Sequence, residues 1–90
     1  MLLVVAYDVA DDRRRVRLHA LLLGYGIPLQ ESLFACTLTD RQAAQLRQRV
    51  RRVAHGTHDR VHMFQICAEC AEKVEDLAGN RLEAPHLFFV

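Results

Sequence analysis

Three stretches of this chain are too rich in apolar and β-branched residues to be loops. Residues 2–7 are apolar at every position, a pattern typical of a strand with both faces covered. Residues 27–38 and 60–67 also favour strands, and Glu31 and Ser32 are expected to mark a bend that divides residues 27–38 in two. The pattern therefore predicts four strands.

A first helix is predicted between the first two strands. Asp11 or Asp12 is suited to cap it, because an aspartate side chain accepts hydrogen bonds from the free amides of a first turn. The helix is expected to run to about Leu23 and to be ended by Gly24 or Gly26. Its buried stripe is expected to contain Val16 or Leu18, Leu21, Leu22 and Tyr25.

A second helix is predicted after residue 38. Thr39 and Gln42 have the spacing of a capping box, in which each side chain accepts from the other residue's backbone amide. Apolar residues then recur at helical spacing, and the other sides carry mainly arginine. The apolar residues are Ala43, Leu46, Val50 and Val53, and the arginines are Arg41, Arg47, Arg49, Arg51 and Arg52. Gly56 follows this helix, and residues 68–77 are expected to form a short acidic helix or turn.

The predicted order of strand, helix, strand, strand, helix and strand is typical of the α+β ferredoxin-like fold, βαββαβ with an antiparallel sheet. Both helices of such a fold cover one face of the sheet. Since the first strand is apolar throughout, we expect the other face to be covered by a second copy, in a sheet-to-sheet homodimer. Residues 1–78 would form this domain. The tail, residues 79–90, ends in the apolar run PHLFFV and is expected to add an extra strand at the dimer or partner interface.

Composition indicates a single small globular domain. The chain has 90 residues, 51% hydrophobic and 26% charged, with no apolar run long enough to span a membrane. The N-terminal apolar run lacks the basic region of a signal peptide and stops at Asp8. Three cysteines, an odd number, fit a reducing compartment. We therefore expect a cytoplasmic protein that does not insert into membranes.

The net charge of +1 hides an uneven distribution. Residues 1–60 carry ten arginines and six acidic residues, whereas residues 61–90 carry two basic and five acidic residues. The first part is therefore a candidate surface for a polyanion. The planar arginine side chain suits two-point contact with phosphate, although high genomic GC content produces the same bias toward arginine.

An acidic residue stands at the end of the first strand, shortly before a cluster of arginines. Asp8 is that acid, and a carboxylate beside phosphate-binding cations suggests metal-assisted phosphodiester chemistry. A strand-end aspartate that only starts a turn is the alternative. The cluster consists of Arg13, Arg14, Arg15 and Arg17 at the start of a helix, where phosphate is favoured. Its alternative is a solvated helix face that Asp11 and Asp12 partly neutralise.

Several motifs in order carry a family resemblance. They are VVAYDV at residues 4–9, DDRRRVRLHALLLGYG at 11–26, QESLF at 30–34 and the Thr-Asp pair that opens the second helix. Over residues 1–77 the chain resembles the Cas-two family of CRISPR-associated proteins. The resemblance implies a ferredoxin-like homodimer that serves in CRISPR adaptation and bridges two dimers of the Cas-one integrase while a spacer is inserted. It also implies binding of protospacer DNA, and metal-dependent cleavage of DNA or single-stranded RNA.

The same resemblance assigns the candidate site. Asp8 matches the strand-end aspartate that, in the family, pairs with its symmetry mate to hold one Mg²⁺ between subunits. Two such carboxylates leave positions open for a phosphate and a nucleophilic water. Tyr7, Ser32 and Phe34 match positions near the cleft, although Tyr7 and Phe34 at strand spacing are also typical of a core. Ala35 departs from the family pattern, in which an acid often follows the phenylalanine.

Two other features leave alternatives open. Cys67 and Cys70 form a single CxxC, but a structural zinc site needs four ligands and no second short-spaced pair exists, so small, partly buried thiols are expected there. Among the histidines, His58 or His62 is expected near the cleft, where it would make cleavage depend on pH. For the whole chain, the alternative to a role in CRISPR adaptation is a toxin-like mRNA interferase of similar fold.

Overall fold

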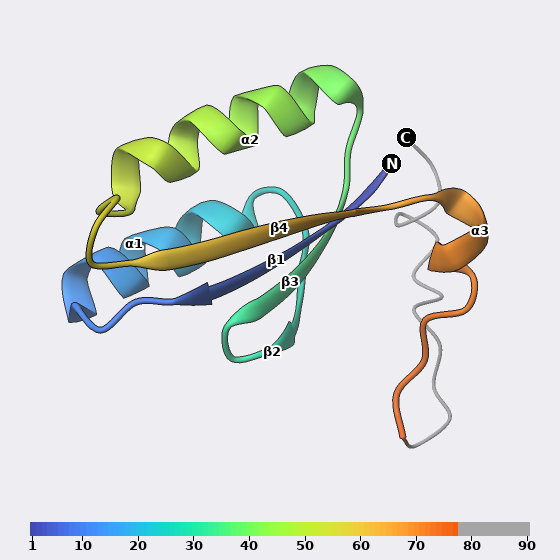
Figure 1. The fold of residues 1–90 in the computed structure, drawn as a ribbon, viewed down its shortest axis with the longest axis horizontal. Helices are drawn as coiled ribbons and strands as arrows, with labels where there is room; N and C mark the ends of the chain where they lie inside the picture. The colour runs from blue at the N-terminus through green and yellow to red at the C-terminus, as the bar shows by residue number, and fades with distance from the viewer. Residues whose placement is uncertain (78–90) are drawn as a thin grey trace.

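The computed structural model describes residues 1–77, and it contains four strands and two long helices in the predicted order (Figure 1). The elements are β1 (Leu2–Asp8), α1 (Asp12–Leu23), β2 (Ile27–Gln30), β3 (Leu33–Thr37), α2 (Asp40–Val53), β4 (Arg60–Ile66) and the short α3 (Ala68–Ala71). The sheet has the order β2-β3-β1-β4 with every neighbouring pair antiparallel. The α+β ferredoxin-like fold is thereby confirmed. The extra strand predicted in residues 79–90 lies outside the described residues.

The caps of both helices follow from local sequence. The carboxylate of Asp11 accepts from the amide of Arg14 at 2.9 Å, so Asp11 is the N-cap and α1 begins at Asp12. In α2 both hydrogen bonds of the capping box form, from the Gln42 amide to Thr39 Oγ1 and from the Thr39 amide to Gln42 Oε1, at 3.1 and 2.9 Å. The predicted starts of both helices are thereby confirmed.

The main core lies between the helices and one face of the sheet. Leu3 and Val5 of β1 are fully buried there, because alternate residues of a strand point to the same face. On α1, Leu18 and Leu22 are fully buried, whereas Val16 is 66% exposed, so Leu18 and not Val16 belongs to the buried stripe. Gly26 is required where the chain enters β2, since a Cβ there would lie 2.2 Å from the carbonyl oxygen of Ala35.

The opposite face of the sheet is only partly covered within residues 1–77. Ala71 of α3 packs beside Leu2, so that end of β1 is buried. Val4 is half-buried, and its neighbour on β4, Phe64, is 53% exposed. We call the residues of this face around Phe64 the open sheet face: Val4 and Ala6 of β1, Leu33 and Ala35 of β3, and His62 and Phe64 of β4. The expected acidic helix is shorter than residues 68–77, because α3 ends at Ala71.

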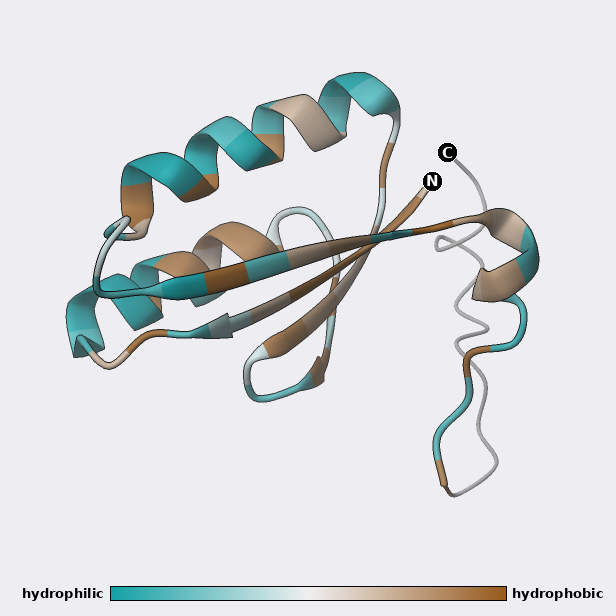
Figure 2. Ribbon diagram, in the orientation of Figure 1, coloured by the Kyte–Doolittle hydropathy of each residue, from teal (hydrophilic) through white to brown (hydrophobic). Residues whose placement is uncertain are grey.

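The hydropathy of the elements agrees with their burial. Figure 2 shows β1 as mainly hydrophobic and α2 as mainly hydrophilic along its length. Only Ala43, Leu46 and Val50 of α2 are buried. No helix within the described residues is long and apolar enough to cross a membrane.

Candidate functional site

Asp8 is the last residue of β1 and its side chain is exposed. Its register partner on β4 is Arg60, and Ala6 pairs in the same way with His62. Together with Ser32 of the β2–β3 turn, these residues line a shallow depression of about 330 Å³. Within residues 1–77, the Asp8 carboxylate accepts no hydrogen bond and forms no ion pair. It is therefore free to bind a ligand.

The antiparallel pairing of β1 with β4 explains why Arg60 and His62 join this site. Residues 8 and 60 are 52 positions apart in the sequence, and only the strand register brings them side by side. His62 also lies on the open sheet face, where its ring stacks with Phe64 at a centroid distance of 6.3 Å. The expectation of a histidine near the cleft therefore applies to His62. His58 instead packs against His55, with ring centroids 4.4 Å apart, in the turn before β4.

The three residues expected near the cleft take different positions. Ser32 lines the depression, and its carbonyl oxygen accepts from the amide of Tyr7 at 3.1 Å, which continues the β1–β3 pairing. Phe34 does not reach the cleft: it is fully buried between the sheet and the helices, because Val5 opposite it on β1 faces the helices too. The cleft expectation for Phe34 is thus corrected to a core position.

Tyr7 contacts both the core and the depression beside Asp8. Its ring packs against Phe34 at 6.3 Å between centroids, while its hydroxyl donates to the Glu31 carbonyl oxygen at 3.2 Å and lies 3.3 Å from His19 Nδ1. Burial, followed by the nearby Glu31 carboxylate, raises the pKa of Tyr7 above 10.0. The phenol therefore stays protonated at neutral pH and supports the wall of the depression beside Asp8.

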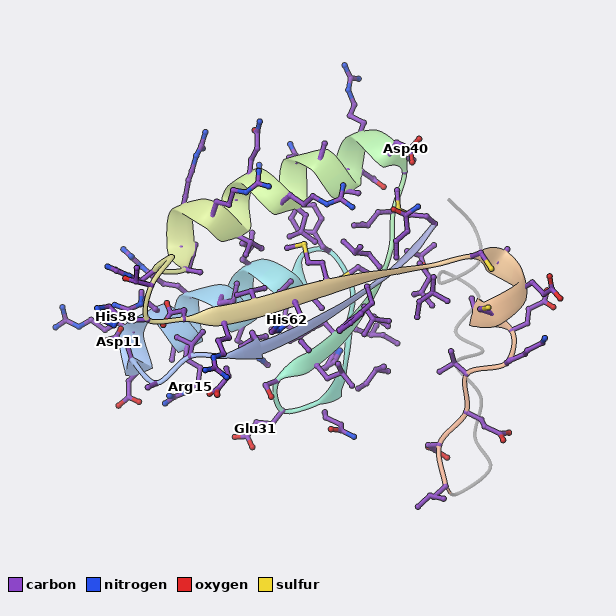
Figure 3. The ribbon with its side chains drawn as sticks, viewed as in Figure 1. Asp11, Arg15, Glu31, Asp40, His58 and His62 are labelled. Atoms are coloured by element: carbon purple, nitrogen blue, oxygen red, sulfur yellow. The ribbon has the colours of Figure 1, made fainter. Side chains whose placement is uncertain are left out.

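A second shallow depression continues from Asp8 toward α1 and is bordered by Arg15, Glu31 and Ser32. Figure 3 shows Arg15 beside the end of β1 and Glu31 at the turn between β2 and β3. Arg15 donates to the carbonyl oxygens of Val9 and Ala10 at 3.1 and 3.3 Å and also pairs with Asp12. This arginine thus fastens the loop between β1 and α1.

Arg14 is also occupied by the fold. Its Nε and Nη2 atoms donate to the two carboxylate oxygens of Asp59 at 2.7 and 3.2 Å, and the Asp59 side chain is only 1% exposed. The hydrogen bond from Arg14 lowers the pKa of Asp59, and Asp59 in turn raises that of Arg14. Arg13 and Arg17 are exposed and form no ion pair within residues 1–77. The expected arginine cluster is therefore split between structural and free side chains.

One chain offers few ligands for a metal ion. No group of three or more His, Cys, Asp and Glu side chains gathers within the described residues. Cys36 is buried, whereas Cys67, the N-cap of α3, and Cys70, within α3, are exposed and belong to no such group among residues 1–77. Asp8 lines the shallow depression with an exposed carboxylate, a ligand type that hard cations prefer.

Comparison with known proteins gives concordant matches. The family model described as CRISPR associated protein Cas2 matches residues 1–74. The CRISPR-associated endoribonuclease Cas2 1 of Chloroflexus aurantiacus is 37% identical over 76 residues, covering 83% of this chain and 82% of that protein. A CRISPR-associated endoribonuclease Cas2 of Thermus thermophilus is 42% identical over 86 residues, covering 92% of each.

Solved structures agree in fold. The hypothetical protein TT1823 from Thermus thermophilus has 41% identity and a TM-score of 0.71, covering 73% of this chain and 80% of that one. Streptococcus pyogenes Cas2 at pH 6.5 has a TM-score of 0.77 at 23% identity, covering 86% and 99%. A chain of a partial Cas6-RT-Cas1–Cas2 complex has a TM-score of 0.70 at 22% identity, covering 91% and 96%. From the family model and the identities above 30%, the chain belongs to the CRISPR associated protein Cas2 family, the Cas-two family that its motifs resemble.

Proposed function

We propose that this protein is a subunit of the CRISPR adaptation complex that, as a homodimer, bridges Cas-one integrase dimers while a spacer is acquired. The proposal rests on one observation: the open sheet face, opposite the helices, is only partly covered within residues 1–77 and leaves Phe64 exposed. A solved structure of this fold comes from a complex whose name includes both Cas1 and Cas2. Relatives above 30% identity are named Cas2 endoribonucleases or endonucleases.

The open sheet face supports the homodimer. Phe64, on the edge strand β4, is 53% exposed on this face, with Val4 of β1 beside it. A chain of this size buries only about 60–65% of the surface that its unfolded form exposes, so further apolar burial is favourable. A second copy packed sheet to sheet would cover Phe64. It would also bring the ends of the two β1 strands, each carrying Asp8, toward one another.

The same packing would complete a metal site. Two Asp8 carboxylates, one from each copy, supply the oxygen ligands that Mg²⁺ prefers and leave its other positions to water and phosphate. When bound there, Mg²⁺ would supply a nucleophilic water and neutralise charge on a phosphodiester. Arg60 and His62 line the same depression, where Arg60 can hold a phosphate of DNA or RNA and His62 can exchange a proton.

The arginines of α1 have unequal roles in nucleic-acid binding. Arg13 and Arg17 are exposed and available to phosphates. Moving Arg14 onto a phosphate would leave the nearly buried Asp59 carboxylate without its partner, which opposes such a movement. Arg15 would contact nucleic acid only at the cost of its loop contacts.

Capture of the partner tests the bridging role. The tagged protein is mixed with the Cas-one integrase of the same organism and a protospacer duplex, and the retained proteins are identified. The wild-type protein is expected to retain the integrase. Phe64→Asp is expected to retain much less, because the bridge requires the dimer. A wild-type protein that is dimeric and retains no integrase would contradict the bridging role.

A further inference from the structure

We infer that the arginines on α2, with the groove between α2 and β4, bind the phosphate backbone of a nucleic-acid duplex. This inference rests on the proposed role in nucleic-acid binding and assigns it a second surface, on α2 and β4 rather than at Asp8 or the exposed arginines of α1. We call this surface the α2 arginine surface: Arg41, Arg47, Arg49, Arg51 and Arg52.

The charge of the α2 arginine surface is not neutralised within residues 1–77. Helix α2 carries five arginines and one acidic residue, Asp40. None of the ion pairs among the described residues includes an arginine of α2. On α1, by contrast, Arg14 and Arg15 are both paired with carboxylates. The free positive charge on this side of the molecule therefore lies mainly on α2.

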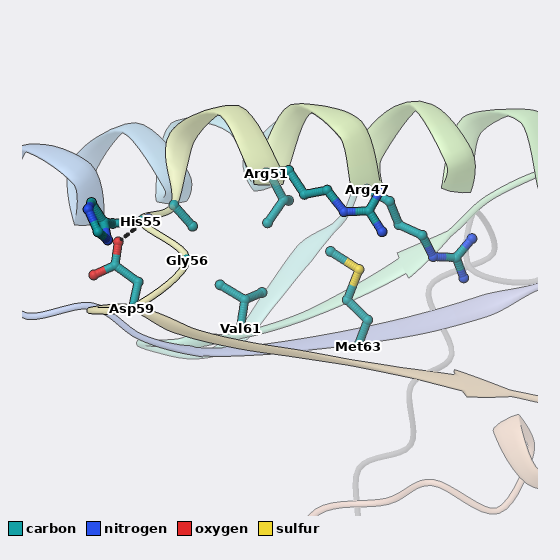
Figure 4. Close-up of a pocket in the computed structure, with 9 residues that line it drawn as sticks. Arg47, Arg51, His55, Gly56, Asp59, Val61 and Met63 are labelled. Atoms are coloured by element: carbon teal, nitrogen blue, oxygen red, sulfur yellow. Dashed lines mark hydrogen bonds between the residues drawn. The ribbon is translucent and has the colours of Figure 1, made fainter.

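The burial pattern directs these arginines outward. Ala43, Leu46 and Val50 hold one side of α2 against the sheet. Arg47 and Arg51 lie one turn apart and border a groove of about 420 Å³, with Val61 and Met63 of β4 opposite them (Figure 4). The two guanidinium groups thus stand together at the rim of a concave surface. Such an arrangement suits successive phosphates better than two isolated arginines would.

The length and composition of α2 favour a duplex over a single strand. Arg41 and Arg52 are separated by about 16 Å along the helix axis, since each residue adds about 1.5 Å. This span matches about five base pairs, each adding about 3.4 Å. Single strands are usually held by exposed aromatic side chains, and α2 has none. The nearby Tyr25 ring is covered by Arg49, whose guanidinium carbon lies 5.8 Å from the ring centroid.

The location of this surface is compatible with the proposed dimer. Helix α2 covers one face of the sheet, and the open sheet face is on the other side (Figure 1). Packing two copies through their open sheet faces would leave both α2 helices accessible. The dimer would therefore present two duplex-binding surfaces directed away from each other.

Binding of a labelled DNA duplex of about 20 base pairs tests the inference, measured by fluorescence anisotropy between about 50 and 200 mM NaCl. Replacing Arg47 and Arg51 together by Gln is expected to weaken binding at least about tenfold at about 100 mM salt. The slope of log K against log salt should become shallower by about two, because two phosphate contacts are lost. Binding within about twofold of wild type would overturn the inference.

Two further variants separate this surface from general charge and from the proposed function. Adding Glu72→Gln and Glu75→Gln, both exposed after α3, restores the net charge of the Arg47 and Arg51 variant. Binding should remain weak; full recovery would mean that only net charge matters, which would also overturn the inference. A matched variant, Arg13→Gln with Arg17→Gln, measures how much the exposed arginines of α1 contribute to duplex binding. Absence of duplex binding by the wild type would contradict the proposed nucleic-acid role itself. A changed oligomeric state of the Arg47 and Arg51 variant in sedimentation would instead identify the surface as a protein interface.

Discussion

Arg14 and Asp59 join α1 to the turn before β4 through a two-contact ion pair, although they are 45 residues apart in the sequence. The Asp59 carboxylate also accepts from the His55 amide at 2.7 Å (Figure 4, dashed line). One carboxylate thus fixes both the end of α1 nearest the site and the turn that starts β4. Since Arg60 follows directly, this pair helps to position the residue beside Asp8.

We predict that Asp59→Asn lowers the melting temperature at pH 7 by several degrees, because Arg14 loses its buried partner. Arg14 lowers the pKa of Asp59, so the pair stabilises the fold above the ordinary value of 3.8 and this stabilisation is lost as pH falls through the lower folded pKa. Wild-type melting temperature should therefore drop on acidification below about pH 4, and the variant should lack this component. Thermal melts from pH 2 to 7 measure both.

Asp12→Asn is the matched control for this prediction. Asp12 also pairs with an arginine, but its side chain is 86% exposed. Exposed pairs contribute little, so its melting temperature should stay close to wild type. An equal loss in both variants would show that the Asp59 pair has no special structural role.

The three thiols are predicted to differ in reactivity. Burial raises the pKa of Cys36 to about 11, whereas hydrogen bonds from the backbone amide and thiol of Cys70 lower the pKa of Cys67. At pH 7.5 an aromatic disulfide reagent should therefore modify Cys67 first, and Cys36 only after denaturation. Cys67→Ser should remove the fast phase. A fast phase that survives in Cys67→Ser would contradict this assignment.

We predict that Phe64→Asp shifts the protein from dimer to monomer. Full burial of a phenylalanine side chain contributes about 2 kcal/mol, so burying the exposed half in both copies contributes about 2 kcal/mol, or about thirtyfold in Kd. The charge of aspartate should add to this loss. Val16→Asp, on the helix side at 66% exposure, is the control and should leave the Kd unchanged. Sedimentation velocity over a range of concentrations distinguishes these outcomes.

Asp8→Asn is predicted to reduce any Mg²⁺-dependent cleavage of DNA or single-stranded RNA by at least about a hundredfold, since it removes both of the carboxylates proposed to hold the metal. The dimer should persist, because Asp8 is exposed and forms no ion pair within residues 1–77. Cleavage is followed on labelled substrates with Mg²⁺ and with a chelator. Undiminished cleavage by the variant would place the activity elsewhere.

The helices, the strands and their order could be predicted from the sequence because local patterns mark each element. The Thr39 and Gln42 pair predicts the start of α2, and the continuous apolar run predicts β1 as a central strand. The family motifs then direct attention to Asp8. These features depend on neighbours within a few residues, so no tertiary contact is needed to recognise them.

Contacts between distant residues could not be predicted in this way. Asp59 gives no local signal that it receives Arg14, and the β1–β4 register that sets Arg60 and His62 beside Asp8 and Ala6 appears only in the folded sheet. Phe34 has strand spacing consistent with either face, and the sheet pairing placed it in the core. Which arginines of α1 form ion pairs and which remain exposed likewise depends on where the carboxylates lie after folding.

The most direct test of the central claim is spacer integration reconstituted from the Cas-one integrase, a protospacer duplex and this protein. We predict that wild-type protein raises integration well above the integrase alone, that Asp8→Asn supports it to a similar extent, and that Phe64→Asp does not. This pattern would mean that bridging depends on the dimer and not on cleavage. Integration that is unaffected by the wild-type protein, or that survives when the dimer is lost in Phe64→Asp, would contradict the account.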